Sequence, residues 1–371
     1  MNILHIITSL ENGGAEKTLY KICKHDSSNQ HTVISLKDSG KYFSTLKKIG
    51  IQVYCLEMKL FSINQFYNLI KKIHHLKPDV VQTWLPHGDF IGGIASRLAG
   101  VNKVVWNIRY SKLKIGVVKL RTIILLNILL KLSHIIPKLI VVVSKSALRN
   151  YKKIGYSNHK LRLIQNGYDL SINRFDKKKI NFRKKYRIKK NIPIIGSISR
   201  YDPTKDHEGL LNSLLILKKR KLSFFCILIG SNINNKHLIE KVKKLKLKNF
   251  VKLLGNSNDV SRSLRGLDFH ILNSKTEGFP NIVAEAMACG TPCVVTDVGD
   301  SSIIVGKTGW IVEPNNSLKL ANKIQEALLE VRKKSWKKRC DQARLRIKNN
   351  FGIKKMINSY NLAWSEVKNN N

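Results

Sequence analysis

The sequence predicts an α/β fold with two doubly wound, Rossmann-like domains that face a cleft. Three observations indicate this fold. The chain has 371 residues, enough for two domains of roughly 150–200 residues each. Short β-rich runs alternate with helical patterns, which is typical of parallel sheets covered by helices. The polar, glycine-containing motifs follow predicted strands, where open α/β sheets bind ligands.

The first domain is predicted over residues 1–176. Helical stretches such as 62–76 and 89–99 separate its strands. The longest apolar stretch, 115–143, is interrupted by Lys119, Arg121 and Lys131, so no uncharged span of 18 residues remains. It divides into a helix at about 117–134 and a buried strand. The strands of this domain are predicted at 2–8, 32–37, 52–57, 79–84, 103–108, 139–143 and 161–165.

The second domain is predicted over 177–352, after a basic stretch, 176–185, that marks the linker. A helix at about 353–368 follows, with Met356, Tyr360, Ala363 and Trp364 on its apolar positions. The strands of the second domain are predicted at 192–198, 224–230, 250–254, 268–273 and 292–296.

The composition limits the possible partners. Lys and Arg number 67 against 24 Asp and Glu, a net charge of +43. Nucleic acid, an anionic membrane surface, or a codon bias toward Lys, Asn and Ile each explain such a charge. The chain contains no RNA- or DNA-binding module, so nucleic acid is not predicted as a partner. The six cysteines form no metal-binding pattern and suit a reducing compartment, and the N-terminus lacks signal-peptide features.

The most informative segment runs from Thr276 to Pro292. Glu277 and Glu285 stand eight residues apart, across a Gly-Phe-Pro-Asn turn that leads into a short helix. Asn281 suits the N-cap of this helix and Gly290 the residue just past its end. The free N–H groups at such a helix start favour a phosphate.

This segment resembles the Glu-x7-Glu motif of the retaining family 4 (group 1) glycosyltransferases, which have the GT-B fold. Other segments match the family in the same order over nearly the whole chain. They are Asn12-Gly13-Gly14-Ala15-Glu16, Ser144-Lys145-Ser146, Asn166-Gly167-Tyr168-Asp169 and the stretch from Ser199 to Asp206. The resemblance implies GT-B architecture, with the C-terminal helix (353–371) crossing back to the first domain.

For the second domain the resemblance implies the binding site of a nucleotide-sugar donor. Arg200 and Lys205 would neutralise the departing pyrophosphate. The chain has no Asp-x-Asp motif, so neither a metal nor another cofactor is expected. Glu285 would hold the ribose, and Glu277 would lie against the sugar as a catalytic residue. The turn and helix start complete the predicted donor-binding set with Gly278, Phe279, Asn281 and Ile282.

In the first, acceptor-side domain, Gly13 and Gly14 lie between a strand and a helix, where the backbone can approach a phosphate. His87 matches the position of a family histidine near the transferred sugar and is the second predicted catalytic residue; a plain loop histidine is the alternative. Arg109 is predicted to meet an acceptor phosphate. Asn166 and Asp169 are expected to shape the turn that leaves the domain.

The predicted function is transfer of a hexose from a UDP- or GDP-linked donor to a lipopolysaccharide, O-antigen or capsule precursor. Basic faces at 63–77 (Lys71, Lys72, Lys77) and 112–131 predict peripheral binding to anionic lipid on the inner face of the cytoplasmic membrane. Two alternatives remain: a GT-B nucleotide-sugar epimerase, and a non-enzymatic anion- or nucleic-acid-binding protein on a decayed transferase scaffold.

Overall fold

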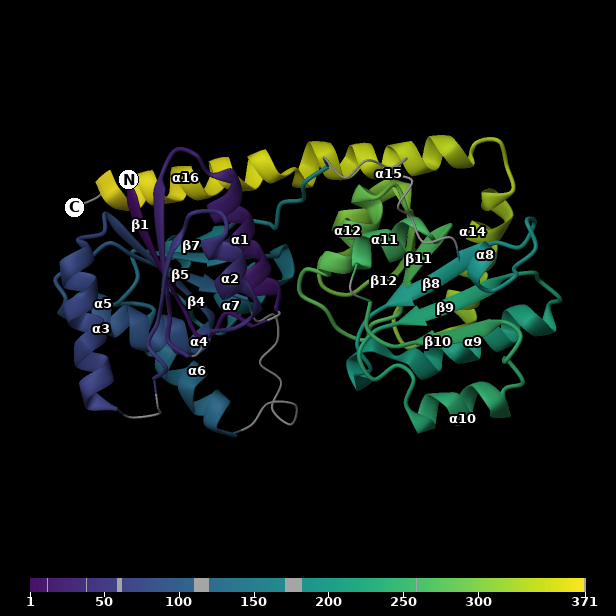
Figure 1. Cartoon of the computed structure of the whole chain (residues 1–371). Helices are drawn as coiled ribbons and strands as arrows, with labels where there is room; N and C mark the ends of the chain where they lie inside the picture. The colour runs from purple at the N-terminus through teal and green to yellow at the C-terminus, as the bar shows by residue number, and fades with distance from the viewer. Residues whose placement is uncertain are drawn as a thin grey trace. The chain divides into compact units, whose positions relative to one another are not determined.

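The computed structural model describes residues 1–11, 13–37, 39–58, 62–109, 120–170, 182–257 and 259–369. The chain divides into two compact units (Figure 1). Unit 1 comprises Met1–Gly167 and Ile353–Asn371, and unit 2 comprises Tyr168–Gly352. The predicted boundary after residue 176 lies outside the described residues. Helix α16 (Ile353–Asn369) belongs to unit 1, as expected for the C-terminal helix.

The described residues of unit 1 form a seven-stranded parallel sheet in the order β3-β2-β1-β4-β5-β6-β7. All strands predicted for the first domain are present. Strand β1 lies between β2 and β4, so the direction of winding reverses there. The strands are β1 (Asn2–Ile7), β2 (Gln30–Ser35), β3 (Gln52–Cys55), β4 (Val80–Trp84), β5 (Val104–Ile108), β6 (Leu139–Val142) and β7 (Leu161–Leu163).

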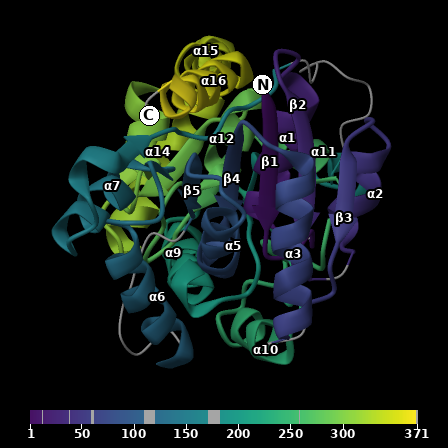
Figure 2. The same ribbon diagram turned by 90° about the vertical axis from the view of Figure 1, so that its left-hand side faces the viewer.

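Alternating side chains of β1 supply two cores. Ile3 and Ile7 pack with helices α1 (Gly14–His25), α2 (Lys41–Lys47) and α16. Leu4 and Ile6 point to the opposite face, which α3 (Ile63–Leu76) and α5 (Gly93–Leu98) cover (Figure 2). Helices α6 (Leu120–Leu132) and α7 (Lys145–Lys153) pack against β5 and β6.

Unit 2 contains a six-stranded parallel sheet, in the order β10-β9-β8-β11-β12-β13 within the described residues. The sequence analysis missed β13, which has only three residues and alternates buried with exposed positions. The strands are β8 (Ile194–Ile198), β9 (Phe225–Ile229), β10 (Val251–Leu254), β11 (Phe269–Leu272), β12 (Cys293–Thr296) and β13 (Trp310–Val312).

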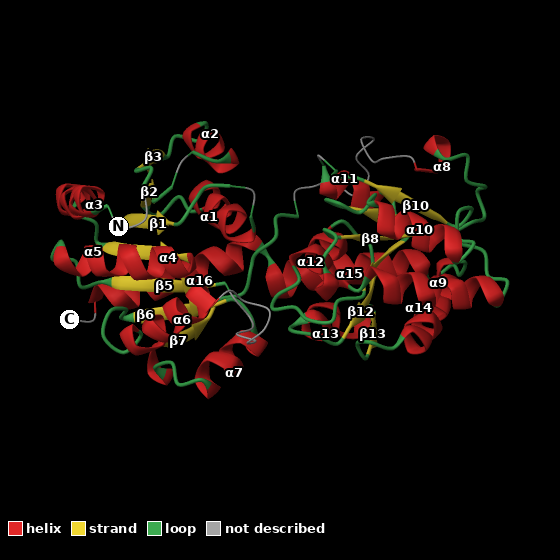
Figure 3. Ribbon diagram, turned by 90° about the horizontal axis from the view of Figure 1, so that it is seen from below, coloured by secondary structure: helices red, strands yellow, loops and turns green. Residues whose placement is uncertain are grey.

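Helices cover both faces of this sheet (Figure 3). One face packs against α9 (His207–Lys219), α10 (Lys236–Lys244) and α14 (Ser317–Val331). The short helix α8 (Phe182–Lys185) precedes β8. The remaining helices pack on one another: α11 (Val260–Arg265), α12 (Asn281–Ala288), α13 (Ser301–Val305) and α15 (Trp336–Phe351). Among the helices that the structure describes, none is long and apolar enough to cross a membrane.

A buried histidine separates the central strands of unit 2. His270 of β11 is fully buried, and its Nε2 accepts a hydrogen bond of 3.1 Å from the backbone N–H of Ile198 in β8. The two strands pair only at Phe269–Ile195 and His270–Gly196. The imidazole therefore takes the place of a ladder bond, and the carboxyl end of β8 is not paired with β11. Burial lowers the pKa of His270 to about 3.

A second buried histidine joins the strands of unit 1. Trp84 Nε1 donates to His5 Nδ1 at 3.2 Å, which leaves the proton of a neutral His5 on Nε2. His5 Nε2 lies 3.0 Å from His31 Nδ1, and His31 Nε2 lies 3.2 Å from Asp26 Oδ2. Burial, and then the charge of His31, lower the pKa of His5 well below its usual value.

Because both His5 and His270 are buried in the neutral form, we expect the free energy of unfolding to decrease as the pH falls below about 6.5. In that range the unfolded chain binds protons that the folded chain does not. Each histidine contributes a slope of about 1.4 kcal/mol per pH unit, down to its pKa in the folded protein. Urea unfolding followed by circular dichroism at several pH values measures this slope.

The variant His270→Gln is the comparison, since the Gln carbonyl can still accept from Ile198 N–H but does not titrate. Between pH 6.5 and 4, this variant should reduce the slope of the free energy of unfolding against pH by about 1.4 kcal/mol per pH unit, the contribution of one histidine. An unchanged slope would show that His270 is not the titrating group.

Candidate functional site

The predicted site residues follow the strands at which each sheet reverses its winding. In unit 1, Gly13 follows β1 and His87 follows β4. In unit 2, Arg200 and Lys205 follow β8, and Glu277 follows β11. Adjacent strands diverge at such a reversal, so the following loops leave room for a ligand there. Within each unit, the sequence motifs therefore meet at one edge of the sheet.

Lys205 and Glu277 form the central contact of the unit 2 site. Lys205 Nζ lies 2.5 Å from Glu277 Oε1, and the hydroxyl of Ser274 donates to the same oxygen at 2.7 Å. The side chains of Lys205 and Glu277 are only 20% and 13% exposed. The ion pair is therefore largely shielded from water, and the charges interact more strongly than a surface pair would.

Arg200, unlike Lys205, forms an ion pair that leaves most of its side chain exposed. Its Nη2 lies 3.1 Å from Asp202 Oδ2, but its side chain is 69% exposed. Hydrogen bonds from Thr204, and then the Arg200 guanidinium, outweigh burial and lower the pKa of Asp202 to about 2. Asp202 also caps the 3-10 turn η3 (Pro203–Lys205) by accepting from the Thr204 N–H. The turn that carries Lys205 is thus fixed by Asp202, while the Arg200 head group is accessible.

Backbone contacts fix the loop that carries Glu277. The N–H of Lys275 donates to Thr204 O at 2.7 Å, and this bond joins the loops after β8 and β11. The Gly278 carbonyl accepts from Asp300 N–H at 2.9 Å. Gly299 has φ +62°, and a Cβ there would lie 2.4 Å from the Gly278 carbonyl oxygen. Only glycine fits at position 299 without moving the loop.

The start of α12 differs in detail from the prediction. Pro280 is the N-cap and Asn281 is the first helical residue, so the assignment of Asn281 as N-cap was wrong. The Asn281 side chain accepts from the Tyr168 hydroxyl at 2.5 Å instead. Phe279 is 8% exposed and its ring stacks on that of Tyr168. These two side chains hold the loop in place, so the first-turn N–H groups are what α12 offers an anion.

The rest of α12 agrees with the prediction. Glu285 and Ile282 are half-buried on the helix, and Glu277 precedes it on the loop. Gly290 follows the C-cap with φ +76°, the left-handed conformation expected after a helix end.

In unit 1, the space beside Gly13 is occupied by a carboxylate. Gly13 is the N-cap of α1 and Gly14 its first residue. A Cβ on Gly13 would lie 2.2 Å from Glu16 Oε2. Burial raises the pKa of Glu16. The glycine thus makes room for the Glu16 side chain at the helix N-terminus, where a carboxylate is favourable.

His87 lies in a tight turn after β4. The short helix α4 (Leu85–His87) leads into a π-helical turn, η1 (Gly88–Gly92). Leu85 has φ +69°, which is unfavourable for a residue with a Cβ. His87 is an exposed residue, but partial desolvation of its imidazole, and then the charge of Lys37, lower its pKa. His87 is therefore presented as a neutral imidazole at physiological pH.

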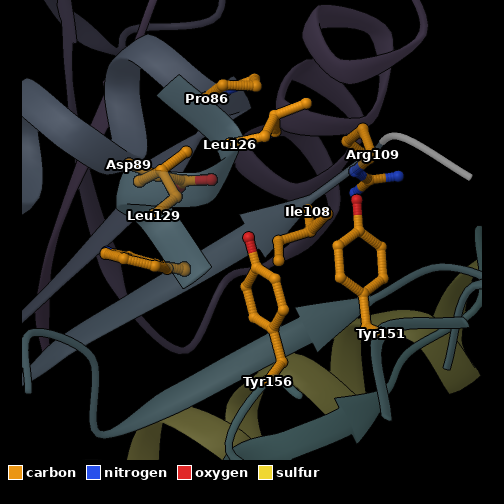
Figure 4. A pocket seen from close by; sticks show the side chains of 9 residues that line it. Pro86, Asp89, Ile108, Arg109, Leu126, Leu129, Tyr151 and Tyr156 are labelled. Atoms are coloured by element: carbon orange, nitrogen blue, oxygen red, sulfur yellow. The ribbon is translucent and has the colours of Figure 1, made fainter. Parts of the chain in front are cut away.

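A small cavity lies beside this turn (Figure 4). Asp89 lines it and is fully buried; its Oδ1 accepts from the Thr83 hydroxyl at 2.5 Å. Burial raises the pKa of Asp89 to about 7. The cavity measures only about 10 Å³, space for no more than one water. Its other lining residues are Pro86, Trp106, Ile108, Arg109, Leu126, Leu129, Tyr151 and Tyr156.

Arg109, the predicted acceptor-binding residue, has several partners within unit 1. Its guanidinium donates to Asn107 Oδ1 at 2.9 Å, to Asn166 Oδ1 at 2.6 Å and to the Tyr360 hydroxyl at 3.1 Å. It also lies over the Trp84 ring. Arg109 thus joins β5, the end of unit 1 and α16, and its contact with an acceptor phosphate stays a prediction.

A hollow of about 470 Å³ lies beside η3 in unit 2. Neither Glu277 nor Glu285 lines it. Its walls are Tyr201, Asp202, Pro203, Asp206, His207, Glu208, Gly209, Asn212, Lys275, Asn315 and Ser317.

One cluster in the described part of the chain has the composition of a metal site. His5, Cys23 and His31 are buried, with ligand atoms within 4.8 Å of one another. A chain of hydrogen bonds runs from Trp84 through His5 and His31 to Asp26 and already uses all four imidazole nitrogens of the two histidines. The cluster is therefore explained as a structural hydrogen-bond relay.

Sequence reasoning missed four residues that shape the unit 2 site: Tyr168, Asp202, Ser274 and Gly299. Asp202 and Ser274 lie within three residues of predicted ones, so a local search for carboxylates and hydroxyls would have found them. Tyr168 lies in the Asn166-Gly167-Tyr168-Asp169 motif, but only tertiary packing shows that it contacts Asn281. Gly299 reaches the site through tertiary packing as well, and the pattern around it gave no signal.

Comparison with known proteins identifies the family. Residues 12–172 match the model "Glycosyltransferase Family 4", and residues 178–344 match "Glycosyl transferases group 1". A galactosyltransferase of Escherichia coli that acts on GlcNAc-diphosphoundecaprenol is 25% identical over 306 residues, which cover 80% of this chain and 76% of that enzyme. The putative glycosyltransferase EpsF of Bacillus subtilis is 24% identical over 316 residues, covering 80% and 79%.

Among solved structures, Anabaena HepE in complex with UDP and glucose superimposes with a TM-score of 0.83 at 21% identity, covering 99% of this chain and 100% of that one. This likeness shows the fold, two Rossmann-like α/β units. The two family matches together span most of the chain, in the order that the sequence motifs indicated. The chain belongs to the group 1, family 4 glycosyltransferases and has the GT-B fold.

Proposed function

We propose that this chain transfers a hexose from a UDP- or GDP-linked donor to a lipid-linked precursor of lipopolysaccharide, O-antigen or capsule. Transfer would retain the anomeric configuration and need no metal ion. The observation that carries this proposal is the grouping, in unit 2, of the cations Arg200 and Lys205 with Glu277 and the N-terminus of α12.

Each part of this group suits one part of a nucleotide sugar. Two cations and free helix N–H groups suit a diphosphate leaving group. Glu277, with Oε1 oriented by Ser274, suits the hydroxyls of the sugar. Glu285, within α12, suits the ribose. The charges that a metal supplies in other transferases would come from Arg200 and Lys205.

The relatives support the proposed substrates. HepE was crystallised with UDP and glucose, and the Escherichia coli relative acts on a diphosphoundecaprenol-linked sugar. His87, presented as a neutral imidazole at the corresponding edge of unit 1, is proposed to act near the transferred sugar.

The first test is a donor panel. The purified chain, in excess EDTA, should release UDP or GDP from one of the common UDP- and GDP-hexoses, since no step of the proposed reaction uses a metal. With an acceptor present, NMR of the product should show the anomeric configuration of the donor. Loss of activity that Mg²⁺ or Mn²⁺ restores, or inversion of configuration, would contradict the proposal.

The second test concerns the two cations. Arg200→Ala and Lys205→Ala should each lower turnover by about 10²–10³, the usual effect of losing one preorganised charge-stabilising donor. Thermal unfolding should change little in Arg200→Ala, because the Arg200 side chain is 69% exposed. Lys205→Ala should also fold but unfold at a lower temperature, because Glu277 loses its counter-ion in a site shielded from water. Lys319→Ala is the matched control: Lys319 forms an exposed ion pair with Glu313 in the same unit, and turnover should be unchanged. Near-normal turnover in both site variants would refute their role.

Membrane binding is proposed for α3, whose outer face combines apolar and basic side chains. Ile63 is 82% exposed and Tyr67 is 55% exposed. Lys71 extends over the Tyr67 ring. Such a face suits a bilayer interface with anionic lipid. Lys72 packs over Tyr54 at 3.7 Å and so has a structural role. Of the other predicted basic face, 112–119 lies outside the described residues.

In sedimentation assays the chain should bind vesicles that contain phosphatidylglycerol, but not pure phosphatidylcholine vesicles, and binding should weaken with salt. The variant Ile63→Ser/Lys71→Glu/Lys77→Glu should lose this binding, while donor hydrolysis persists. The control reverses three lysines of α10 in unit 2: Lys236, Lys243 and Lys244. If both variants lose binding equally, the attraction comes from the total charge rather than from α3.

A further inference from the structure

The unit 2 site contains an ion pair between the two groups that are proposed to bind different parts of the donor. Lys205 is placed for the diphosphate and Glu277 for the sugar, yet Nζ of Lys205 lies 2.5 Å from Oε1 of Glu277. No single part of a nucleotide sugar can occupy the space between them while this contact persists. A ligand that takes Lys205 with its diphosphate and Glu277 with its sugar would replace this contact.

The surroundings of the pair make partial replacement unfavourable. Glu277 is 13% exposed, and within the described structure its recorded partners are Lys205 and Ser274. If a diphosphate alone took Lys205, the Glu277 carboxylate would be left shielded from water with only a hydroxyl donor. A buried charge without its counter-ion is strongly unfavourable. A sugar hydroxyl beside Glu277 would restore a hydrogen bond to that carboxylate.

From this geometry we infer that the Lys205–Glu277 pair is a specificity determinant, which favours the intact nucleotide sugar over the free nucleoside diphosphate. The inference rests on the proposed function, because it assumes that both ligands bind here. The sugar-bearing ligand provides a partner for each ion, whereas the free diphosphate provides one for Lys205 and opposes Glu277 by like-charge repulsion.

A consequence follows for turnover. Once the sugar has left, Glu277 regains Lys205 and competes with the diphosphate for it. The pair therefore lowers the affinity for the nucleotide product and assists its release. Arg200 cannot serve this purpose in the same way, because its own side chain is 69% exposed and can exchange partners at little cost.

The test is isothermal titration of the full chain and its Glu277→Gln variant with UDP and with UDP-glucose, or with GDP and GDP-mannose if the donor panel selects GDP. The variant should bind the free nucleoside diphosphate about tenfold more tightly than the parent does, since Lys205 no longer has a competing carboxylate. Its affinity for the nucleotide sugar should not rise by the same factor, so the parent's preference for the sugar-bearing ligand is lost.

Two controls separate the contact from general electrostatics. Glu313→Gln removes a carboxylate that pairs with a lysine at the surface of the same unit, where Glu313 Oε1 lies 2.7 Å from Lys319 Nζ; it should leave both affinities unchanged. The ratio of the two affinities between parent and Glu277→Gln should also persist from 0.1 to 1 M salt, because the contact is direct and largely shielded from water. General attraction over longer distances would be screened, since the Debye length falls from about 10 Å to about 3 Å over this range. A ratio that disappears in high salt would overturn the inference.

The outcomes distinguish the two proposals. A Glu277→Gln variant that folds like the parent and binds the free diphosphate no more tightly overturns the specificity role and leaves the proposed function intact. A parent chain that binds neither nucleotide nor nucleotide sugar overturns both.

Discussion

The arrangement of both candidate sites depends on parallel strand pairing with one reversal of winding in each sheet. Parallel pairing brings the carboxyl ends of all strands to one edge, and the reversal separates the loops that follow two neighbouring strands. In unit 2 the His270 imidazole strengthens this effect, since it accepts the Ile198 N–H in place of a strand carbonyl. The loops that carry Arg200, Lys205 and Glu277 begin directly beyond that point.

The charges of the site are balanced locally, in contrast to the chain as a whole. The net charge of +43 suggests a strongly positive surface, yet Lys205 contacts Glu277 and Arg200 contacts Asp202. A ligand at this site therefore meets ion pairs rather than free cations. Under the proposed role of the Lys205–Glu277 pair, local pairing would give the site selectivity that total charge cannot give, because a long-range field attracts every anion alike.

Several side chains for which ligand contacts are predicted also have structural roles. Phe279 and Asn281 pack against Tyr168, and Arg109 joins three segments of unit 1. These contacts hold the loops in one conformation before any ligand is bound, which lowers the conformational entropy lost on binding. A residue within a family motif can thus contribute to ligand binding by fixing the conformation of a loop.

The sequence alone determined the fold class, nearly every strand and the position of the motifs, because hydrophobic periodicity and glycine-containing turns are local properties. It also placed Glu277 on a loop, Glu285 on a helix and Gly290 beyond that helix. Tertiary structure alone decided which groups touch. That Lys205 pairs with Glu277, and that the Tyr168 hydroxyl bonds to Asn281, depend on contacts between side chains. Such contacts follow from packing across loops that are distant in sequence, and no spacing along the chain encodes them.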